Sequence, residues 1–252
     1  MKKQILSASI IGLLSAGSVS AAEPIHYYVI EKQAQPFQIE KNGVTHSGIV
    51  TDIVKAVFDD TKYELKYHTY PFNRMITQLE AREQENWITY GSPTWGNIQS
   101  ANLSDIPIYN VKHTLMSSNK KPFEFEDMKD LDDKAVVLLM GFEYPNLDPY
   151  IEQGKLAELR VKDYTAAFRV LKRIPGDTVF VEMESRVKYN LAMQKLDPKS
   201  FQIQSFSSVI PDYPIHLAFD PKMDQQLQGF INQRLKDLKS SGKLEAIVDS
   251  YL

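Results

Sequence analysis

Strand-like and helix-like segments alternate along this chain, and their order constrains the fold more than any other feature of the sequence. Ile49, Ile53 and Val57 recur at the spacing that places apolar side chains on one face of a helix. Strand–helix–strand order predicts an α/β layer. The first predicted elements are a strand at 25–30, a helix at 48–60, a strand at 63–70, a helix at 71–84 and a strand at 86–91.

A second block of the same kind begins after residue 117. The continuous apolar run at 135–140 is typical of a strand that is buried on both faces. In the short helix that follows, Asp148 is a capping residue, Pro149 suits the first turn and Gly154 suits the end. Further strands are predicted at 157–162, 178–182, 201–206 and 215–219, with helices at 164–174, 185–196, 224–239 and 242–252.

The chain breaks between these blocks near residues 117–119 and again near residues 207–214. We predict that residues 23–117 and 212–252 form one lobe, and that residues 118–211 form a second lobe inserted into it. The helical tail then returns to the first lobe. Because the chain crosses between the lobes twice, the crossings are predicted to form a hinge.

The first 22 residues have the three parts of a secretory signal peptide. Lys2 and Lys3 precede an apolar stretch, and small residues follow it up to Ala21 and Ala22. The apolar stretch is too short for a membrane-spanning helix, which needs about 20 residues. We predict cleavage after Ala21 or Ala22 and export to a periplasm.

Composition excludes several classes of function. The chain has no cysteine, so disulfides, thiol catalysis and a cysteine-linked lipid are excluded. A net charge of -3 gives no basic surface for nucleic acid. The five histidines show no metal-binding spacing, and we expect neither a metal nor a cofactor.

Several segments resemble the family 3 extracellular solute-binding proteins, in this order and spacing: "QPFQIEKNGVTHSGIVTDIVKAVF", "YPFNRMITQL", "SDIPIYNVKHTLMSS", "DMKDLDDKAVVLLMGFEY", "DTVFVE" and "LKSSGKLEAIVDSYL". The resemblance implies the type II periplasmic binding protein fold, an α/β structure of two lobes that close on a ligand. It also implies transport of polar amino acids and similar solutes by ABC importers.

The loop "GSPTWGN" follows the predicted strand at 86–91, and ligands in open α/β sheets sit beyond the carboxyl ends of strands. Ser92 and Thr94 offer hydroxyls to a ligand or cap the next helix, and Trp95 offers an apolar wall. The resemblance places Asn97 where amino-acid binders carry a carboxylate-binding Arg, and Glu182 where they carry an Asp for the α-amino group. We therefore predict that standard α-amino acids bind poorly, and that a ligand with amine or hydroxyl groups or an aromatic body fits better.

Other side chains complete the predicted ligand-binding site, each with a plainer alternative. Aromatic residues in the first lobe either line the pocket or pack in a loop or core, and Arg74 either binds an anion or lies in solvent. The turn "MGFEYP" of the second lobe offers backbone N–H groups to an anion if it faces the cleft, and Glu143 there either lies in solvent or selects cations. These residues are Phe37, Phe72, Arg74, Phe142, Glu143 and Tyr144.

Two functions remain open from the sequence. The first is a monomeric binding protein that delivers a small molecule to a membrane ABC permease or receptor and catalyses nothing. The alternative is an enzyme on the same fold, similar to cyclohexadienyl or arogenate dehydratases, in which Glu182 or Glu143 acts as a general acid. We favour the binding protein, because the sequence shows no recognised catalytic constellation.

Overall fold

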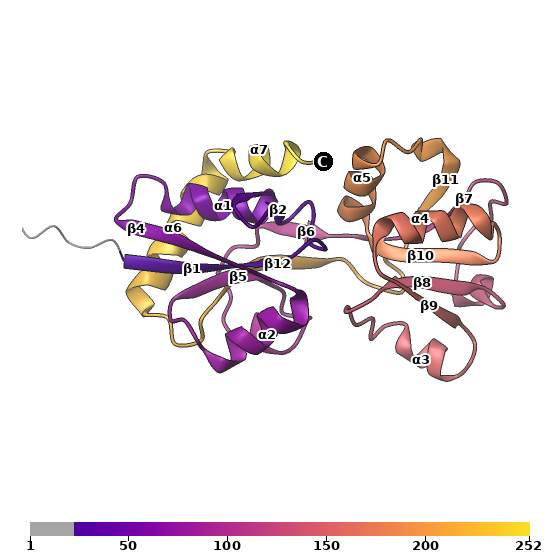
Figure 1. The fold of residues 1–252 in the computed structure, drawn as a ribbon, viewed down its shortest axis with the longest axis horizontal. Helices are drawn as coiled ribbons and strands as arrows, with labels where there is room; N and C mark the ends of the chain where they lie inside the picture. The colour runs from indigo at the N-terminus through magenta and orange to yellow at the C-terminus, as the bar shows by residue number, and fades with distance from the viewer. Residues whose placement is uncertain (1–22) are drawn as a thin grey trace, which may run out of the picture.

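The computed structural model describes residues 23–252, and the predicted signal peptide lies outside the described residues. Two five-stranded sheets, each covered by helices, form two lobes that lie side by side along the long axis of the molecule (Figure 1). Within the described part of the chain, no helix is both long and apolar enough to cross a membrane.

Lobe 1 is built on a sheet of strand order β4-β1-β5-β12-β6. Strands β4, β1, β5 and β6 run in the same direction, and β12 runs antiparallel between β5 and β6. Helices α1, α6 and α7 cover one face and α2 covers the other (Figure 1). The elements are β1 (Glu23–Ile30), β2 (Ile39–Lys41), β3 (Thr45–Ser47), α1 (Ile49–Phe58), β4 (Tyr63–Tyr70), α2 (Phe72–Ala81), β5 (Trp87–Gly91), η1 (Ile98–Ser100), β6 (Tyr109–Val111), β12 (Tyr213–Phe219), α6 (Gln225–Ser240) and α7 (Lys243–Asp249).

Lobe 2 is built on a sheet of strand order β11-β7-β10-β8-β9. The apolar run at 135–140 forms β8, whose residues from Val136 onward are buried, as expected for a strand packed on both faces. The elements are β7 (His113–Ser118), η2 (Met128–Leu131), β8 (Ala135–Leu139), α3 (Asp148–Glu152), β9 (Ala157–Val161), α4 (Tyr164–Arg173), β10 (Thr178–Met183), α5 (Glu184–Met193), η3 (Pro198–Ser200) and β11 (Phe201–Ser205).

The chain passes between the lobes twice, first between β6 and β7 and then between β11 and β12. The first crossing lies at Lys112, because β7 pairs with β10 and β11 of lobe 2. The boundary predicted at residue 117 is therefore wrong. The polar residues 117–119 mark the end of β7, whereas the crossing itself is a continuous extended segment with no break in composition.

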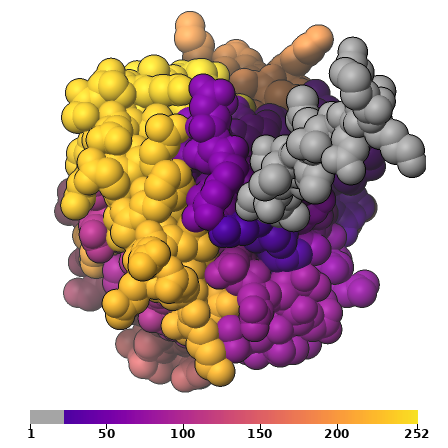
Figure 2. Space-filling model, turned by 90° about the vertical axis from the view of Figure 1, so that its left-hand side faces the viewer, coloured from indigo at the N-terminus to yellow at the C-terminus, as the bar shows by residue number. Residues whose placement is uncertain are grey.

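The C-terminal tail belongs to lobe 1: α6 lies toward its outer end (Figure 2), and α7 runs from there back toward lobe 2 (Figure 1). Arg234 of α6 donates to the carbonyl oxygens of Val57 at 3.0 Å and Asp59 at 3.0 Å, at the end of α1. Tyr251 accepts a hydrogen bond from the N–H of Gly48 at 2.9 Å. The tail adds no further crossing, so within residues 23–252 the two crossings are the only covalent links between the lobes.

Candidate functional site

A cavity of about 700 Å³ lies between the two lobes and is lined by residues of both. Lobe 1 contributes the end of β5, the loop after it and the first turns of α2. Lobe 2 contributes the turn after β8 and the junction of β10 with α5. The cavity therefore lies beyond the ends of strands in both lobes, as is usual for ligand sites in open α/β sheets.

The lobes touch on both sides of this cavity. Phe72 of α2 stacks on Phe142 of lobe 2, with ring centroids 5.5 Å apart. The guanidinium of Arg186 lies 3.4 Å from the hydroxyl of Tyr90 in lobe 1. Met183, at the end of β10, packs into the hydrophobic core of lobe 1. The structure is thus a closed arrangement in which a guest would contact both lobes at once.

Three aromatic side chains form the lobe 1 wall of the cavity. Trp95 packs edge-on against Tyr90 at 5.6 Å and against Tyr213 at 6.2 Å. Burial raises the pKa of Tyr213 to about 12, so its hydroxyl stays protonated and able to donate. An apolar wall with hydroxyl groups at its edge is suited to a ligand that has a hydrophobic body.

Hydrogen bonds order the loop after β5, in which the N–H of Trp95 donates to the carbonyl oxygen of Ser92 at 3.2 Å. A side chain on Gly91 would meet the carbonyl oxygen of Gln99 at 1.8 Å, so only glycine fits there. Gln99 donates to the carbonyl oxygen of Tyr90 at 2.8 Å. Asn97 has a φ of 52°, which asparagine tolerates, and its side chain accepts from the N–H of Gln99 at 2.9 Å. The carboxamide oxygen of Asn97 is therefore already engaged in a hydrogen bond within the loop.

The polar end of the cavity is the pair formed by Glu182 and Arg186. Both side chains are buried, with exposed fractions of 4% and 3%, and their nearest nitrogen and oxygen atoms are 3.6 Å apart. The carboxylate of Glu182 also accepts from the N–H of Met183 at 2.8 Å and from the hydroxyl of Tyr164 at 3.3 Å. Burial raises the pKa of Glu182, and the charge of Arg186 opposes that rise.

The guanidinium of Arg186 is held over the rings of Phe37 at 5.7 Å and Phe142 at 5.2 Å. Burial acts to lower the pKa of Arg186, but the neighbouring Tyr164 and Glu182 raise it, so this side chain stays charged. Within residues 23–252, its Nε has no hydrogen-bond partner. The same holds for Nδ1 of His113, another buried residue of the cavity lining.

The structure brings most of the predicted site residues to this one cavity. They are Phe72, Thr94, Trp95, Asn97, Phe142, Glu143, Tyr144 and Glu182. Three others are not in the lining. Phe37 is fully buried between Tyr90 and Tyr109, Ser92 is buried and bonded to Thr94 at 3.0 Å, and Arg74 is exposed and lies over the ring of Tyr70.

Sequence reasoning missed Arg186, His113 and Tyr213. One signal for Arg186 was available, because it follows Glu182 by four residues where a strand passes directly into a helix. No local pattern singles out His113 or Tyr213. They reach the cavity because both crossings run through it.

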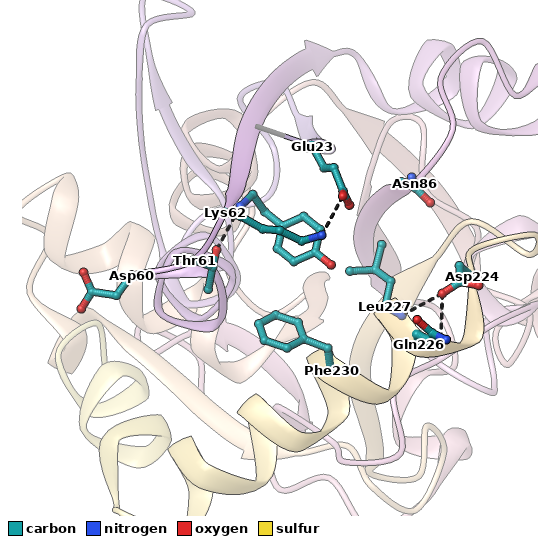
Figure 3. Close-up of a pocket in the computed structure, with 10 residues that line it drawn as sticks. Glu23, Asp60, Thr61, Lys62, Asn86, Asp224, Gln226, Leu227 and Phe230 are labelled. Carbon is teal, nitrogen blue, oxygen red and sulfur yellow. Dashed lines mark hydrogen bonds and ion pairs between the residues drawn. The ribbon is translucent and has the colours of Figure 1, made fainter. Parts of the chain in front are cut away.

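A second cavity, of about 550 Å³, lies on lobe 1 alone, beside the first residue of β1 and the start of α6 (Figure 3). Several of its polar side chains already have partners. Lys62 pairs with Glu23 at 2.6 Å, and Asp224 caps α6 by accepting from the N–H groups of Gln226 and Leu227. This outer cavity contains no residue of lobe 2, so its occupation would not act on the hinge.

Comparison with known proteins places this geometry in a family. The family model of the bacterial extracellular solute-binding proteins, family 3, matches residues 28–252. The chain is similar to the arginine-binding extracellular protein ArtP of Bacillus subtilis (strain 168), with 23% identity over 224 residues, 84% of this chain and 80% of that protein.

Two solved structures show the same fold. The substrate binding protein of an amino acid ABC transporter aligns with a TM-score of 0.67 and 18% identity, over 91% of this chain and 99% of that chain. A histidine kinase sensor domain with similarity to periplasmic binding proteins aligns with a TM-score of 0.70 and 16% identity, over 92% of this chain and 97% of that chain.

Proposed function

The chain belongs to the bacterial extracellular solute-binding proteins, family 3, and from that premise we propose that it captures a small molecule between its lobes in the periplasm. The predicted family and the two-lobed type II fold are confirmed. The observation that carries the proposal is the 700 Å³ cavity whose lining comes from both lobes. A ligand that contacts both lobes stabilises the closed form, because only that form makes both sets of contacts.

We propose that a membrane partner, either an ABC permease or a receptor, recognises the closed form of the protein. One similar structure comes from an ABC transporter and the other from a histidine kinase sensor domain. The closed form brings Phe72 and Phe142 of opposite lobes into contact, so it presents a joined surface that the open form lacks. Export by the predicted signal peptide is consistent with an extracellular family.

We propose that standard α-amino acids, including the arginine of ArtP's name, are not the ligands of this chain. Asn97 replaces the family's arginine, and its side-chain oxygen is held by Gln99. Glu182 replaces the family's aspartate, and it is paired with Arg186. Neither of the family's usual anchors is therefore free for an amino-acid backbone. We also propose binding without turnover, which an assay of each bound compound for chemical change tests.

The proposal is tested by Trp95→Ala, measured by calorimetry on compounds selected in a thermal-shift screen of sugars, polyamines, organic acids and aromatic metabolites. Loss of an aromatic anchor in a binding pocket weakens affinity by more than about 1 kcal/mol. The matched control is Phe230→Ala, which removes an aromatic ring from the outer cavity of Figure 3 and should leave affinity unchanged. Equal affinities of Trp95→Ala and the wild-type protein would contradict the proposed site.

A further inference from the structure

Resting on the proposed function, we infer that the ligand is an organic monocarboxylate whose acid group is bound by Arg186 of lobe 2. The missing loop arginine of lobe 1 is thus replaced by a guanidinium on the opposite side of the same cavity. The rest of the ligand is an apolar or aromatic body packed against the wall that contains Trp95 and Tyr213.

The first reason is that the hydrogen bonds of Arg186 are incomplete. A guanidinium has five N–H donors, and an arginine that is 3% exposed has almost no access to water. Within the described residues its contacts are long, 3.4 Å to the hydroxyl of Tyr90 and 3.6 Å to Glu182, and Nε has no partner. Leaving buried donors unpaired is costly, so a ligand that supplies oxygen atoms here gains that free energy on binding.

The second reason is the orientation of the guanidinium. Phe37 and Phe142 lie against it, which fixes the side chain and excludes water from it. A planar, fixed fork of N–H groups matches the two oxygens of a carboxylate, and such bidentate pairs are the strongest that arginine makes. His113 adds a second unpartnered buried nitrogen to the cavity lining. Its pKa is lowered to about 4 by burial and by Arg186, so the ring is neutral and one of its nitrogens carries a proton to donate.

The third reason is that the buried acid of the site is already satisfied. Glu182 accepts from Met183 and Tyr164 and faces Arg186, so an ammonium group would have to displace existing partners. The remaining acids of the lining, Glu143 and Asp212, are exposed, and Asp212 accepts from Ser207 at 2.6 Å. Two carboxylates at the exposed side of the cavity disfavour further negative charge on the ligand, which restricts it to one acid group.

The test uses four probes that share one phenylpropyl body and differ in the head group: 3-phenylpropionate, 3-phenylpropanamide, 3-phenylpropylamine and phenylalanine. Calorimetry with the wild-type protein at neutral pH should give the tightest binding for 3-phenylpropionate. We expect the amide and the amine to bind at least about tenfold more weakly, because they lose the hydrogen bonds between two charged groups. Phenylalanine should also bind more weakly than 3-phenylpropionate, since its ammonium has no free acid to contact.

Arg186→Gln should remove the preference for acid over amide, and Arg186→Lys should reduce it, because a lysine keeps the charge but lacks the planar fork. Arg169→Gln is the matched control, since it removes an exposed arginine from α4 of the same lobe and should keep the preference intact. The head-group series in the wild-type protein needs no variant, so it decides the proposal by itself where Arg186→Gln is unstable.

Equal affinity for acid and amide, tighter binding of the amine, or no binding of any of the four probes overturns this inference. Unchanged acid binding by a folded Arg186→Gln protein does so as well. A screen that finds a neutral or cationic ligand whose binding requires Trp95 overturns the monocarboxylate and leaves the proposed function standing. If binding of no ligand depends on Trp95, both the monocarboxylate inference and the proposed function are contradicted.

Discussion

Each lobe contains an arginine–carboxylate pair whose acid is buried, and the two pairs differ in how completely their hydrogen bonds are made. In lobe 1, Arg82 donates from Nε and Nη2 to the two oxygens of Asp220, both at 3.1 Å. The N–H groups of Asn86 and Lys222 donate to the same carboxylate at 3.2 and 3.0 Å. In lobe 2, Arg186 and Glu182 approach only to 3.6 Å.

The pKa shifts of the two acids have opposite signs for this reason. Burial acts to raise the pKa of both carboxyls. At Asp220 the hydrogen bonds from Arg82 and from Lys222 N–H outweigh burial, and the pKa is lowered. At Glu182 burial outweighs the attraction of Arg186, and the pKa is raised. A saturated pair at the end of β12 therefore supports the fold, whereas the incomplete pair lies where lobe 1 and lobe 2 meet.

The largest expected effect is on stability, from Asp220→Ala. Four N–H donors lose their acceptor, and removing one partner of a buried pair destabilises by about 3 kcal/mol where, as here, the arginine is partly exposed. Urea titration of the free protein measures the change, and affinity for ligand should be unaltered. If the free energy of unfolding falls by less than the error of extrapolating the urea titration to water, the pair in lobe 1 contributes as little to stability as an exposed ion pair.

The second effect is a pH dependence that originates in the cleft. The pKa of His113 is about 4 in the folded protein and 6.5 in an ordinary environment, so the unfolded chain binds the proton more tightly. The stability that neutral His113 contributes is present above pH 6.5 and is lost as pH falls through 6.5 toward 4. Linkage gives a loss of about 2 kcal/mol between pH 7 and 5.

Urea titrations at pH 7 and pH 5 measure that loss, and His113→Asn should remove most of it. Arg186→Gln should reduce it in part, because the charge of Arg186 is the second cause of the shift after burial. The same pH dependence in His113→Asn would assign it to the histidines of lobe 1, His26, His46 and His68, whose pKa values burial also lowers.

The fold was predictable because its signals are local. The burial of β8 follows from a continuous apolar run. The helix predicted at 71–84 is present as α2, although it begins at Phe72, with Pro71 as the capping residue before it, and ends at Ala81. The cavity loop after β5 also followed from its glycine and tryptophan. For Arg186 the only signal was its spacing of four residues from Glu182, because nothing else in its neighbours distinguishes a helix residue that faces solvent from one that faces the other lobe.

Phe37 is the opposite case: the sequence predicted it in the binding site, and the structure does not place it in the cavity lining. An aromatic residue after the first strand was assigned to the pocket by resemblance, yet the structure buries it entirely beneath Tyr90 and Tyr109. It acts on the cavity only through the ring face that it presents to Arg186. Residue type predicts that such a ring is buried, but only topology decides whether a ligand or a neighbouring strand covers it.

The third prediction, Glu182→Gln, separates the inferred acid ligand from an amine ligand. The substitution keeps the shape of the side chain and removes the charge that partly neutralises Arg186. We expect 3-phenylpropionate to bind about tenfold more tightly, a change of about 1.4 kcal/mol. The free protein should lose stability, because an uncompensated guanidinium stays buried, and saturating 3-phenylpropionate should restore it.

Calorimetry and thermal shift on the same samples measure both changes. Weaker binding of the acid by Glu182→Gln would mean that Glu182 organises Arg186 rather than competing with the ligand for it. If Glu182→Gln instead binds an amine more weakly than the wild-type protein does, Glu182 binds an amino group of the ligand, as the acid at this position does in amino-acid binders of the family.

The smallest expected effect, the stability loss of Asp224→Ala, provides a reference for the loss expected of Asp220→Ala. Asp224 accepts from two backbone N–H groups at the start of α6, Gln226 at 2.8 Å and Leu227 at 3.2 Å, and no arginine within residues 23–252 forms an ion pair with it. Asp224→Ala should cost about 1 kcal/mol, the usual value for a lost helix cap. Asp220 accepts from two backbone N–H groups and from Arg82 as well, so the excess of Asp220→Ala over Asp224→Ala in the same urea titration reports what the paired arginine adds. If the two losses are equal, the arginine adds nothing, and the stability of the lobe 1 pair comes from its backbone hydrogen bonds alone.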